Sequence, residues 1–334
     1  MAGSTEQEAQ DRLNSDPRRL IISLAMLVTC IPALAVFSRQ VSYAAPLAPP
    51  QTTSRYMVTV DPKTLYNEGC HQGAAHKAGV IVLDFGQASY QNGTYGTILF
   101  NNLFASLSQI TTASESFLQG FWDCSPPDGP LMTLALGTSN YHGETTYAHG
   151  QAWALAVNLV GSWISAHNFL SQETVAGASD LELGWNSASA TRAWTDGYTS
   201  KAQYFYYDYG DAAGCPQVAT TDNGSCNNGW RQSDIVYIAW EEEPALPLPE
   251  IHTTNGSQAR QWYSLTLYSY LHPGQFSRMI SQGSFTQYGA CQNSSCDGTD
   301  NTPTQGWRQF WTALNADSRT AQDLTYLTDM TKAN

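Results

Sequence analysis

The sequence predicts an α/β fold, a (β/α)8 TIM-like barrel with disulfide-tied loops, from three observations. Short apolar runs alternate with segments of helical periodicity from about residue 55 onward. Seven or eight such runs fit the roughly 250 residues that a (β/α)8 barrel occupies. No Gly-x-Gly-x-x-Gly motif favours a dinucleotide-binding sheet. We therefore expect one parallel barrel with crossover helices.

The expected strands and helices alternate along the chain. The continuous apolar runs at residues 80–86 and 131–137 indicate strands buried on both faces. Apolar residues at helical spacing predict an amphipathic helix over residues 151–170. The later elements are a strand within 175–184, a helix at 191–198, strands at 204–209, 234–240 and 246–251, a helix at 258–271, a strand at 284–288 and a helix at 306–314. Pro247 and Pro249 each remove a ladder donor, so the barrel is expected to be irregular or incomplete there.

The first 54 residues are predicted to precede the barrel. Residues 1–19 form a polar leader, which we expect to be cytoplasmic because it ends in two arginines. The uncharged run 20–37 indicates either a signal anchor that spans the membrane or a cleaved signal peptide. Residues 38–54, rich in Pro and Ala, read as a linker, and 55–334 as a single domain. The predicted location is extracellular or at a bacterial cell surface.

Composition narrows the class of partner. The 334 residues carry 15 Lys and Arg against 28 Asp and Glu, a net charge of -13, so a nucleic-acid partner is excluded. Only 13% of residues are charged, well below the roughly 25% of average domains. Neutral polar residues must therefore build much of the surface, with 10 Trp and 18 Tyr among them. Such a surface suits sugars, and the same mixture also marks many secreted proteins.

The cysteines indicate disulfides in an oxidising compartment. Cys30 lies in the apolar run, which leaves six cysteines and 15 conceivable connectivities in the exported part. Proximity pairs Cys215 with Cys226 and Cys291 with Cys296, and Cys70 with Cys124 then remains. No Cys-x-x-Cys or His-x-x-x-His spacing supports zinc, and we predict neither a metal nor a cofactor.

Acidic residues at the predicted strand ends suggest a reaction site. The carboxyl ends of barrel strands carry the active site in this fold. Five acids lie at or near such ends: Asp84, Asp180, Glu182, Asp208 and Glu250. Asp180 and Glu182 share one face of an extended strand, about 6.6 Å apart at their Cα atoms. Carboxylates that meet in one pocket raise each other's pKa, and one can then serve as the general acid of glycosidic cleavage. For any single acid, helix capping or a structural hydrogen-bond network is an equally simple explanation.

These residues resemble those of a known family. Asp84 with Gln87, and the Asp180-Leu181-Glu182 tripeptide, are similar to motifs of glycoside hydrolase family 25, the lysozyme-like muramidases, and of related bacterial barrels of unassigned activity. The resemblance spans residues 78–315 and implies a barrel that cleaves β-1,4 bonds in peptidoglycan. It implies Glu182 as the acid, while Asp180 orients the substrate or stabilises charge.

Asp84 completes the predicted catalytic set, and five further residues are predicted to bind substrate: Gln87, Trp185, Asp208, Trp240 and Glu250. Aromatic residues at strand and helix positions are more often core than stacking platforms. The predicted function is an exported glycoside hydrolase-like protein that acts on cell-wall or extracellular polysaccharide. The alternatives are a barrel that binds glycan without turnover and a purely structural surface protein.

Overall fold

The computed structural model describes residues 45–218, 220–274, 278–292, 296 and 298–332. The predicted leader 1–19 and apolar segment 20–37 lie outside these residues. Among the residues described, no helix has the length and apolar character of a membrane span. Residues 45–334 form one compact unit.

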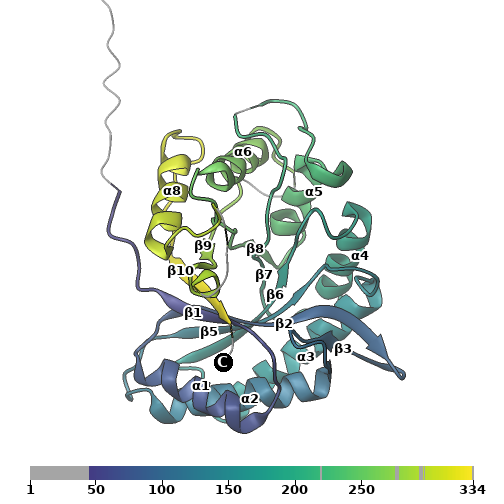
Figure 1. The fold of residues 1–334 in the computed structure, drawn as a ribbon, viewed down its shortest axis with the longest axis vertical. Helices are drawn as coiled ribbons and strands as arrows, with labels where there is room; N and C mark the ends of the chain where they lie inside the picture. The colour runs from purple at the N-terminus through teal and green to yellow at the C-terminus, as the bar shows by residue number, and fades with distance from the viewer. Residues whose placement is uncertain (1–44, 219, 275–277, 293–295, 297, 333–334) are drawn as a thin grey trace, which may run out of the picture. The chain divides into compact units, whose positions relative to one another are not determined.

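Eight parallel strands in this unit form a nearly closed barrel, with helices around it (Figure 1). The barrel strands are β1 (Thr52–Tyr56), β2 (Gly79–Gln91), β5 (Met132–Ser139), β6 (Glu173–Asp180), β7 (Tyr206–Asp208), β8 (Ala245–Pro247), β9 (Gly283–Thr286) and β10 (Tyr326–Lys332). Successive strands pair in chain order except β8 and β9, β10 lies beside β1, and every barrel pair is parallel. The predicted α/β barrel is therefore confirmed.

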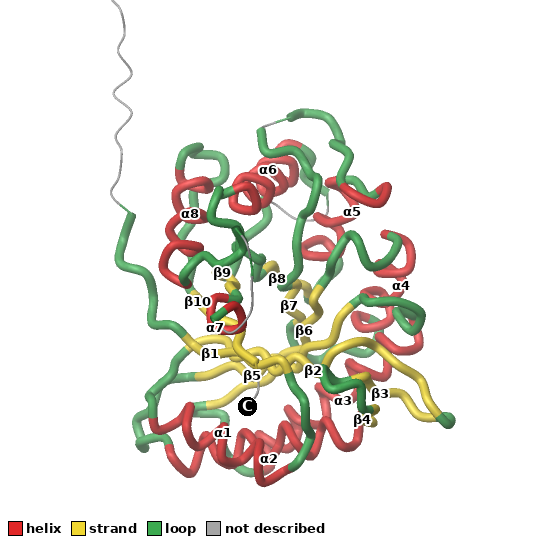
Figure 2. The backbone as a smooth tube through the Cα atoms, viewed as in Figure 1, coloured by secondary structure: helices red, strands yellow, loops and turns green. Residues whose placement is uncertain are grey.

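Helices connect most of the barrel strands. They are α1 (Pro62–Ala74), α2 (Leu107–Cys124), α3 (Tyr147–Ala166), α4 (Ala188–Thr199), the short η1 (Asn227–Gly229), α5 (Gln232–Val236), η2 (Tyr237–Glu241), α6 (Ser257–Leu271), α7 (Tyr288–Cys291) and α8 (Pro303–Asn315). The antiparallel strands β3 (Thr94–Ile98) and β4 (Phe104–Ser106) extend the sheet from the far end of β2 (Figure 2). This β2–β3–β4 extension follows the carboxyl end of a barrel strand, which is where a (β/α)8 barrel places its site.

Two apolar layers hold the fold together. The larger one lies between strands and helices and contains residues such as Leu83, Phe117 and Trp153. The smaller one fills the barrel with side chains that alternate along the strands: Val80, Val82, Ala135, Ala176, Ala178, Tyr207, Tyr209, Leu248, Phe285 and Met330. Because strand side chains have a period of two, this set identifies which face of each strand points into the barrel.

The barrel is irregular where the sequence predicts it. Strand β8 has three residues, and the chain beyond it is joined to β9 by few hydrogen bonds. The carbonyls of Pro247 and Pro249 accept from Gln282 and Phe285, and Phe285 accepts from the Ile251 amide. The prolines contribute acceptors to this seam but no donors, so it carries fewer bonds than a regular ladder.

One predicted strand is wrong. Residues 234–240 are helical and belong to α5 and η2. The buried residues of this stretch are Ile235, Val236, Ile238 and Ala239, a pattern of i, i+1, i+3 and i+4 that fits a helix. The Asp234 carboxylate accepts from the Arg231 amide and so caps the first turn, which a strand would not need.

Several elements have no counterpart in the prediction. Strand β1 begins at Thr52, inside the segment 38–54 that the sequence assigned to a linker. Helices α1 and α2, the β3–β4 pair and the closing strand β10 were also not expected. The hydroxyls of Thr52 and Ser54 on β1 make buried hydrogen bonds to neighbouring strands, so polar residues form a barrel strand that carries no apolar signal.

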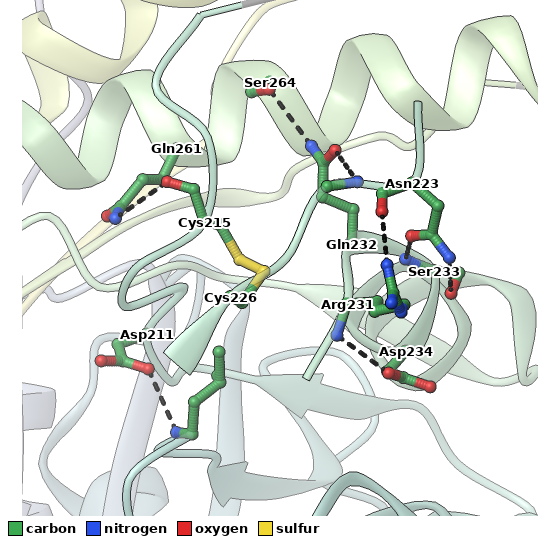
Figure 3. The surroundings of a disulfide bond; sticks show 12 residues. Asp211, Cys215, Asn223, Cys226, Arg231, Gln232, Ser233, Asp234, Gln261 and Ser264 are labelled. Atoms are coloured by element: carbon green, nitrogen blue, oxygen red, sulfur yellow. Dashed lines mark hydrogen bonds between the residues drawn. A yellow bond between two sulfur atoms is a disulfide. The ribbon is translucent and has the colours of Figure 1, made fainter. Parts of the chain in front are cut away.

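All three predicted disulfides are confirmed: Cys70–Cys124, Cys215–Cys226 and Cys291–Cys296. The first joins α1 to α2, and the second closes the loop after β7 (Figure 3). These bonds are compatible with an oxidising, extracellular location.

A buried histidine fixes the β3 strand to the helices. His149 on α3 is fully buried, and its Nε2 donates to the Gly96 carbonyl of β3 at 2.9 Å. Its Nδ1 accepts from Trp194 Nε1 of α4 at 3.0 Å, which sets the neutral tautomer. Burial lowers the pKa of His149 to about 4.

This burial predicts a loss of stability in acid. The unfolded chain takes up a proton at its ordinary pKa near 6.5, whereas the folded His149 does so only near 4. Stability should therefore fall by up to about 3 kcal/mol as pH drops through this window. Thermal unfolding of wild type and His149→Gln across that range checks this: the variant should be less stable near neutrality but lose less on acidification. Parallel curves for the two proteins would contradict it, and His71→Gln, at an exposed position, serves as control.

Candidate active site

Strand alternation places two of the predicted acids at the mouth of the barrel. Asp84 follows Val80 and Val82 on the inner face of β2, and Asp180 follows Ala176 and Ala178 on the inner face of β6. Asp84 is fully buried and Asp180 is 6% exposed. Both lie where each strand approaches its carboxyl end, as the sequence predicted.

A bulge follows Asp84 and redirects the chain. The pairing register of β2 with β5 shifts between Asp84 and Gln87, and the Gly86 amide donates to Asp84 Oδ1 at 2.8 Å. Gly86 has a φ of 85°, and a Cβ atom there would lie 2.2 Å from the Ile98 carbonyl oxygen. Glycine is therefore required at this position, where the β3 strand packs closely on β2.

Three carboxyl groups from two parts of the chain converge at this end. Side-chain oxygens of Asp180, Glu182 and Glu250 lie within 4.8 Å of one another. Glu250 is 6% exposed, and Glu182 is half-buried. The same spacing would suit one divalent cation, which takes oxygen ligands at roughly 2.3–2.6 Å, although the sequence predicted no metal.

Asn140 positions Glu182 through the backbone. Its Oδ1 accepts from the Glu182 amide, and its Nδ2 donates to the Glu182 carbonyl, both at 3.1 Å. Asn140 follows β5, is 1% exposed and also donates to Thr191 on α4. Sequence reasoning missed this residue because a lone Asn after a strand carries no motif.

Asp211 is a second residue that the prediction omitted. Its Oδ1 accepts from the Leu183 amide at 3.3 Å, and its carboxyl group hydrogen-bonds to that of Glu182. The preceding Gly210 allows this approach, since a Cβ atom there would lie 2.2 Å from the Leu181 carbonyl oxygen. Asp211 lies near the loop that Cys215–Cys226 closes (Figure 3).

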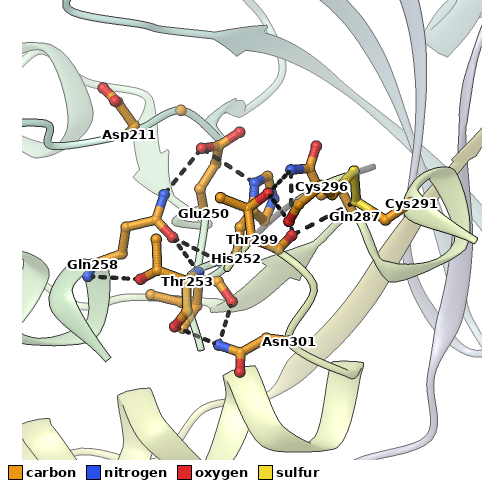
Figure 4. Close-up of polar contacts among 12 residues, drawn as sticks. Asp211, Glu250, His252, Thr253, Gln258, Gln287, Cys291, Cys296, Thr299 and Asn301 are labelled. Carbon is orange, nitrogen blue, oxygen red and sulfur yellow. Dashed lines mark hydrogen bonds and ion pairs between the residues drawn. A yellow bond between two sulfur atoms is a disulfide. The ribbon is translucent and has the colours of Figure 1, made fainter. Parts of the chain in front are cut away.

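Glu250 has neutral partners. Its Oε2 lies 3.3 Å from Gln258 Nε2 and 3.5 Å from His252 Nδ1 (Figure 4). Burial lowers the pKa of His252 to about 3, so this contact is not an ion pair at neutral pH. Figure 4 also shows Asp211 near this group.

Burial and mutual repulsion keep protons on these acids. Burial, then the charge of Asp211, raises the pKa of Glu182 to about 8. Burial and the charge of Glu182 raise the pKa values of Asp180 and Glu250 well above normal. Burial raises the pKa of Asp84 to about 6, while the Gly86 amide and the Tyr209 hydroxyl oppose it. Near neutral pH the group can therefore hold both a proton donor and a carboxylate.

Two tyrosines were not predicted and lie among the acids. Burial raises the pKa of Tyr56, and the charges of Asp180 and Glu250 raise it further. Tyr209 shows the same effect from burial and from the charges of Asp84 and Asp180. Both phenols therefore stay protonated and can donate hydrogen bonds. Tyr56 ends β1 and Tyr209 directly follows β7, so only the barrel structure shows that they lie among the acids.

A pocket opens beside Asp180. It measures about 250 Å³ and is lined by Gly86, Gln87, Ile98, Leu99, Phe100, Asn102, Ser139, Tyr141, Asp180 and Trp185. The rings of Tyr141 and Trp185 meet edge to face at 5.4 Å. Gln87 and Trp185, both predicted to bind substrate, thus share a pocket with a predicted catalytic acid. A larger hollow of about 580 Å³ lies between α6 and α8 and contains none of the five acids.

Two predicted binding residues lie elsewhere. Asp208 is 2% exposed and lies between Tyr207 and Tyr209, whose side chains belong to the apolar layer inside the barrel. The side chain of Asp208 therefore leaves the strand on its outer face. Its Oδ1 accepts from the Gly210 amide at 3.0 Å, which is a turn contact. Trp240 lies in η2 before β8, hence toward the amino end of that strand, and packs against the outer apolar layer.

No protein-family model matches the chain, and no curated protein matches it significantly. The fold and the site geometry therefore carry the functional argument.

Proposed function

We propose that the protein is an exported glycoside hydrolase-like barrel that acts on cell-wall or extracellular polysaccharide by carboxylate chemistry. The observation that carries this proposal is the convergence of Asp180, Glu182 and Glu250 within 4.8 Å beside an aromatic pocket. Glycosidic cleavage needs one protonated carboxyl group to donate to the leaving oxygen and a second group to attack or stabilise the anomeric carbon.

In this proposal Glu182 is the acid. It is the most exposed of the three converging acids, and its raised pKa keeps it protonated near neutrality. Asp180 lines the pocket and, in its ionised form, would stabilise positive charge on the sugar ring. Asp84 is fully buried, so we assign it to electrostatic support of Asp180. The family 25 resemblance of these residues points to the same roles and to peptidoglycan as a substrate.

A direct assay tests the proposal. Full-length protein is incubated with peptidoglycan, chitin and other polysaccharides, and new reducing ends are measured. We expect release from at least one of them, lost on heat denaturation. Absence of release from every polysaccharide would set the enzyme proposal aside.

A second candidate function is glycan binding without turnover. It is favoured by the hydrogen bond that the protonated Glu182 carboxyl group donates to Asp211, which engages the proposed acid within the protein. Retention of the protein on an insoluble polysaccharide, without reducing-end release, would support this candidate.

A further inference from the structure

The acids at the barrel mouth lack cationic partners. We call Asp84, Asp180, Glu182, Asp211 and Glu250 the acid cluster. Among the residues that the structure describes, the ion pairs with Lys or Arg are Arg55–Glu68, Arg192–Asp234 and Arg319–Asp317, all outside the cluster. The histidine beside Glu250 is neutral. Because no cation among the described residues relieves the repulsion between these acids, they retain protons, and a bound ammonium group would favour the ionised form of the acid beside it.

The pocket beside Asp180 also lacks a cationic side chain among the residues described. Its lining residues, all of them described, include Asp180 but no Lys or Arg. The remaining side chains are apolar, aromatic or neutral and polar, with Trp185 and Tyr141 among them. Aromatic faces attract cations as well as sugar rings, and an anionic ligand would find no positive group in this lining.

A separate observation indicates where the cationic group of a ligand would bind. Asp180 is 94% buried, since only 6% of it is exposed, and it lines the pocket, yet its Oδ1 has no hydrogen-bond partner among the described residues. Asp84 Oδ2, fully buried on the same inner face, also lacks a partner. Buried polar atoms are normally satisfied, so an unpartnered oxygen on an acidic side chain that lines a pocket points to a ligand that donates to that side chain.

We infer that the pocket takes a sugar ring bearing a free, protonated amino group, with the ammonium donating to Asp180. The substrate class is then a glycan of amino sugars that are not N-acetylated, which differs from the N-acetylated peptidoglycan to which the family 25 resemblance points. This inference rests on the proposed function for its assignment of the pocket to carbohydrate. It disfavours anionic glycans, whose carboxylates would be repelled by the acid cluster.

Binding of matched oligosaccharides to the full-length protein tests this. Calorimetric titrations compare β-1,4-linked tetrasaccharides of glucosamine, of N-acetylglucosamine and of a uronic acid, at a pH where the amine is protonated. A chelator in the buffer excludes bridging metal. We expect the glucosamine oligomer to bind at least tenfold more tightly than the acetylated one, and the anionic one to bind most weakly. Equal or reversed affinities, or no binding of any oligomer, would overturn the inference.

Substitutions test whether Asp180 causes the preference for the glucosamine oligomer. Asp180→Asn should reduce the preference to within about threefold, whereas Asp128→Asn, an exposed acid before β5, should keep it. Unfolding of Asp180→Asn would leave the wild-type comparison as the deciding result. Reducing-end assays on the same oligomers separate the two proposals. Amine preference without cleavage removes the enzyme proposal alone, and cleavage without amine preference removes this inference alone.

Discussion

Replacement of Glu182 by glutamine is expected to reduce glycan cleavage by about a thousandfold while glycan binding persists. Glutamine has the same shape but carries no proton that it can transfer to a leaving oxygen. General acid catalysis contributes about 10²–10⁴-fold in enzymes, so the loss should fall within that range. The Asn140 contacts are to the backbone of residue 182, and the substitution leaves them in place. Reducing-end kinetics and a binding titration measure the two effects.

The pH profile adds a second test of this role. A general acid must be protonated, so the wild-type rate should fall as pH rises through about 8, the pKa of Glu182. Glu243→Gln, an exposed glutamate before β8, serves as the matched control and should retain full activity. Unchanged turnover in Glu182→Gln would transfer the acid role to Glu250 or Asp180.

Replacement of Glu173 by glutamine is expected to stabilise the protein by about 2–3 kcal/mol near pH 7. Glu173 begins β6, is fully buried, and its carboxyl group has no hydrogen-bond partner among the described residues apart from the backbone of Trp122. Burial raises its pKa to about 9, and the charge of Asp123 adds to this. The folded protein must therefore take up a proton that the unfolded chain releases at its ordinary pKa.

The sign of the pH dependence follows from the raised pKa. Below about pH 4.5 both states are protonated and Glu173 costs no proton uptake. As pH rises from there toward 9, the unfolded state is ionised while the folded state is not, and stability falls. Glutamine does not titrate, so the substitution removes the contribution of residue 173 to the fall of stability with rising pH. Thermal unfolding of wild type and variant should diverge with rising pH, by several degrees near neutrality. A variant no more stable than wild type at pH 7 would contradict the prediction, and Glu243→Gln again provides the control.

Local patterns in the sequence predict much of this protein. The apolar runs and helical periods lead to a parallel barrel, and the spacing of cysteines leads to the three disulfides. Pro247 at the end of β8 and Pro249 just after it predict an irregular seam, because a proline lacks the backbone N–H donor in any fold. The period of two along a strand also explains why Asp84 and Asp180 lie on the inner face, since both follow apolar residues of that face.

Other features depend on which segments become neighbours. Residues 234–240 contain enough apolar side chains for either a strand or a helix. In the structure they are helical, and α5 packs against α6. Strand β1 is stabilised by Thr and Ser hydroxyls that bond to adjacent strands, so its apolar content gives no signal. Asp208 and Trp240 are residue types that suit a sugar site. In the structure, however, Asp208 forms a turn contact with Gly210, and Trp240 packs from a helix against the outer apolar layer.

The sequence by itself determined the fold class, the disulfides and the position of acids at strand ends, because each depends on periodicity or on separation along the chain. Only the tertiary structure decided which acids meet. Glu250, Asp211 and Asn140 reach Glu182 from three other strand ends, and Tyr56 joins them from the first strand. Barrel closure brings these residues together, and the resulting exclusion of water, with no Lys or Arg paired to the acids in the described part of the chain, raises their pKa values.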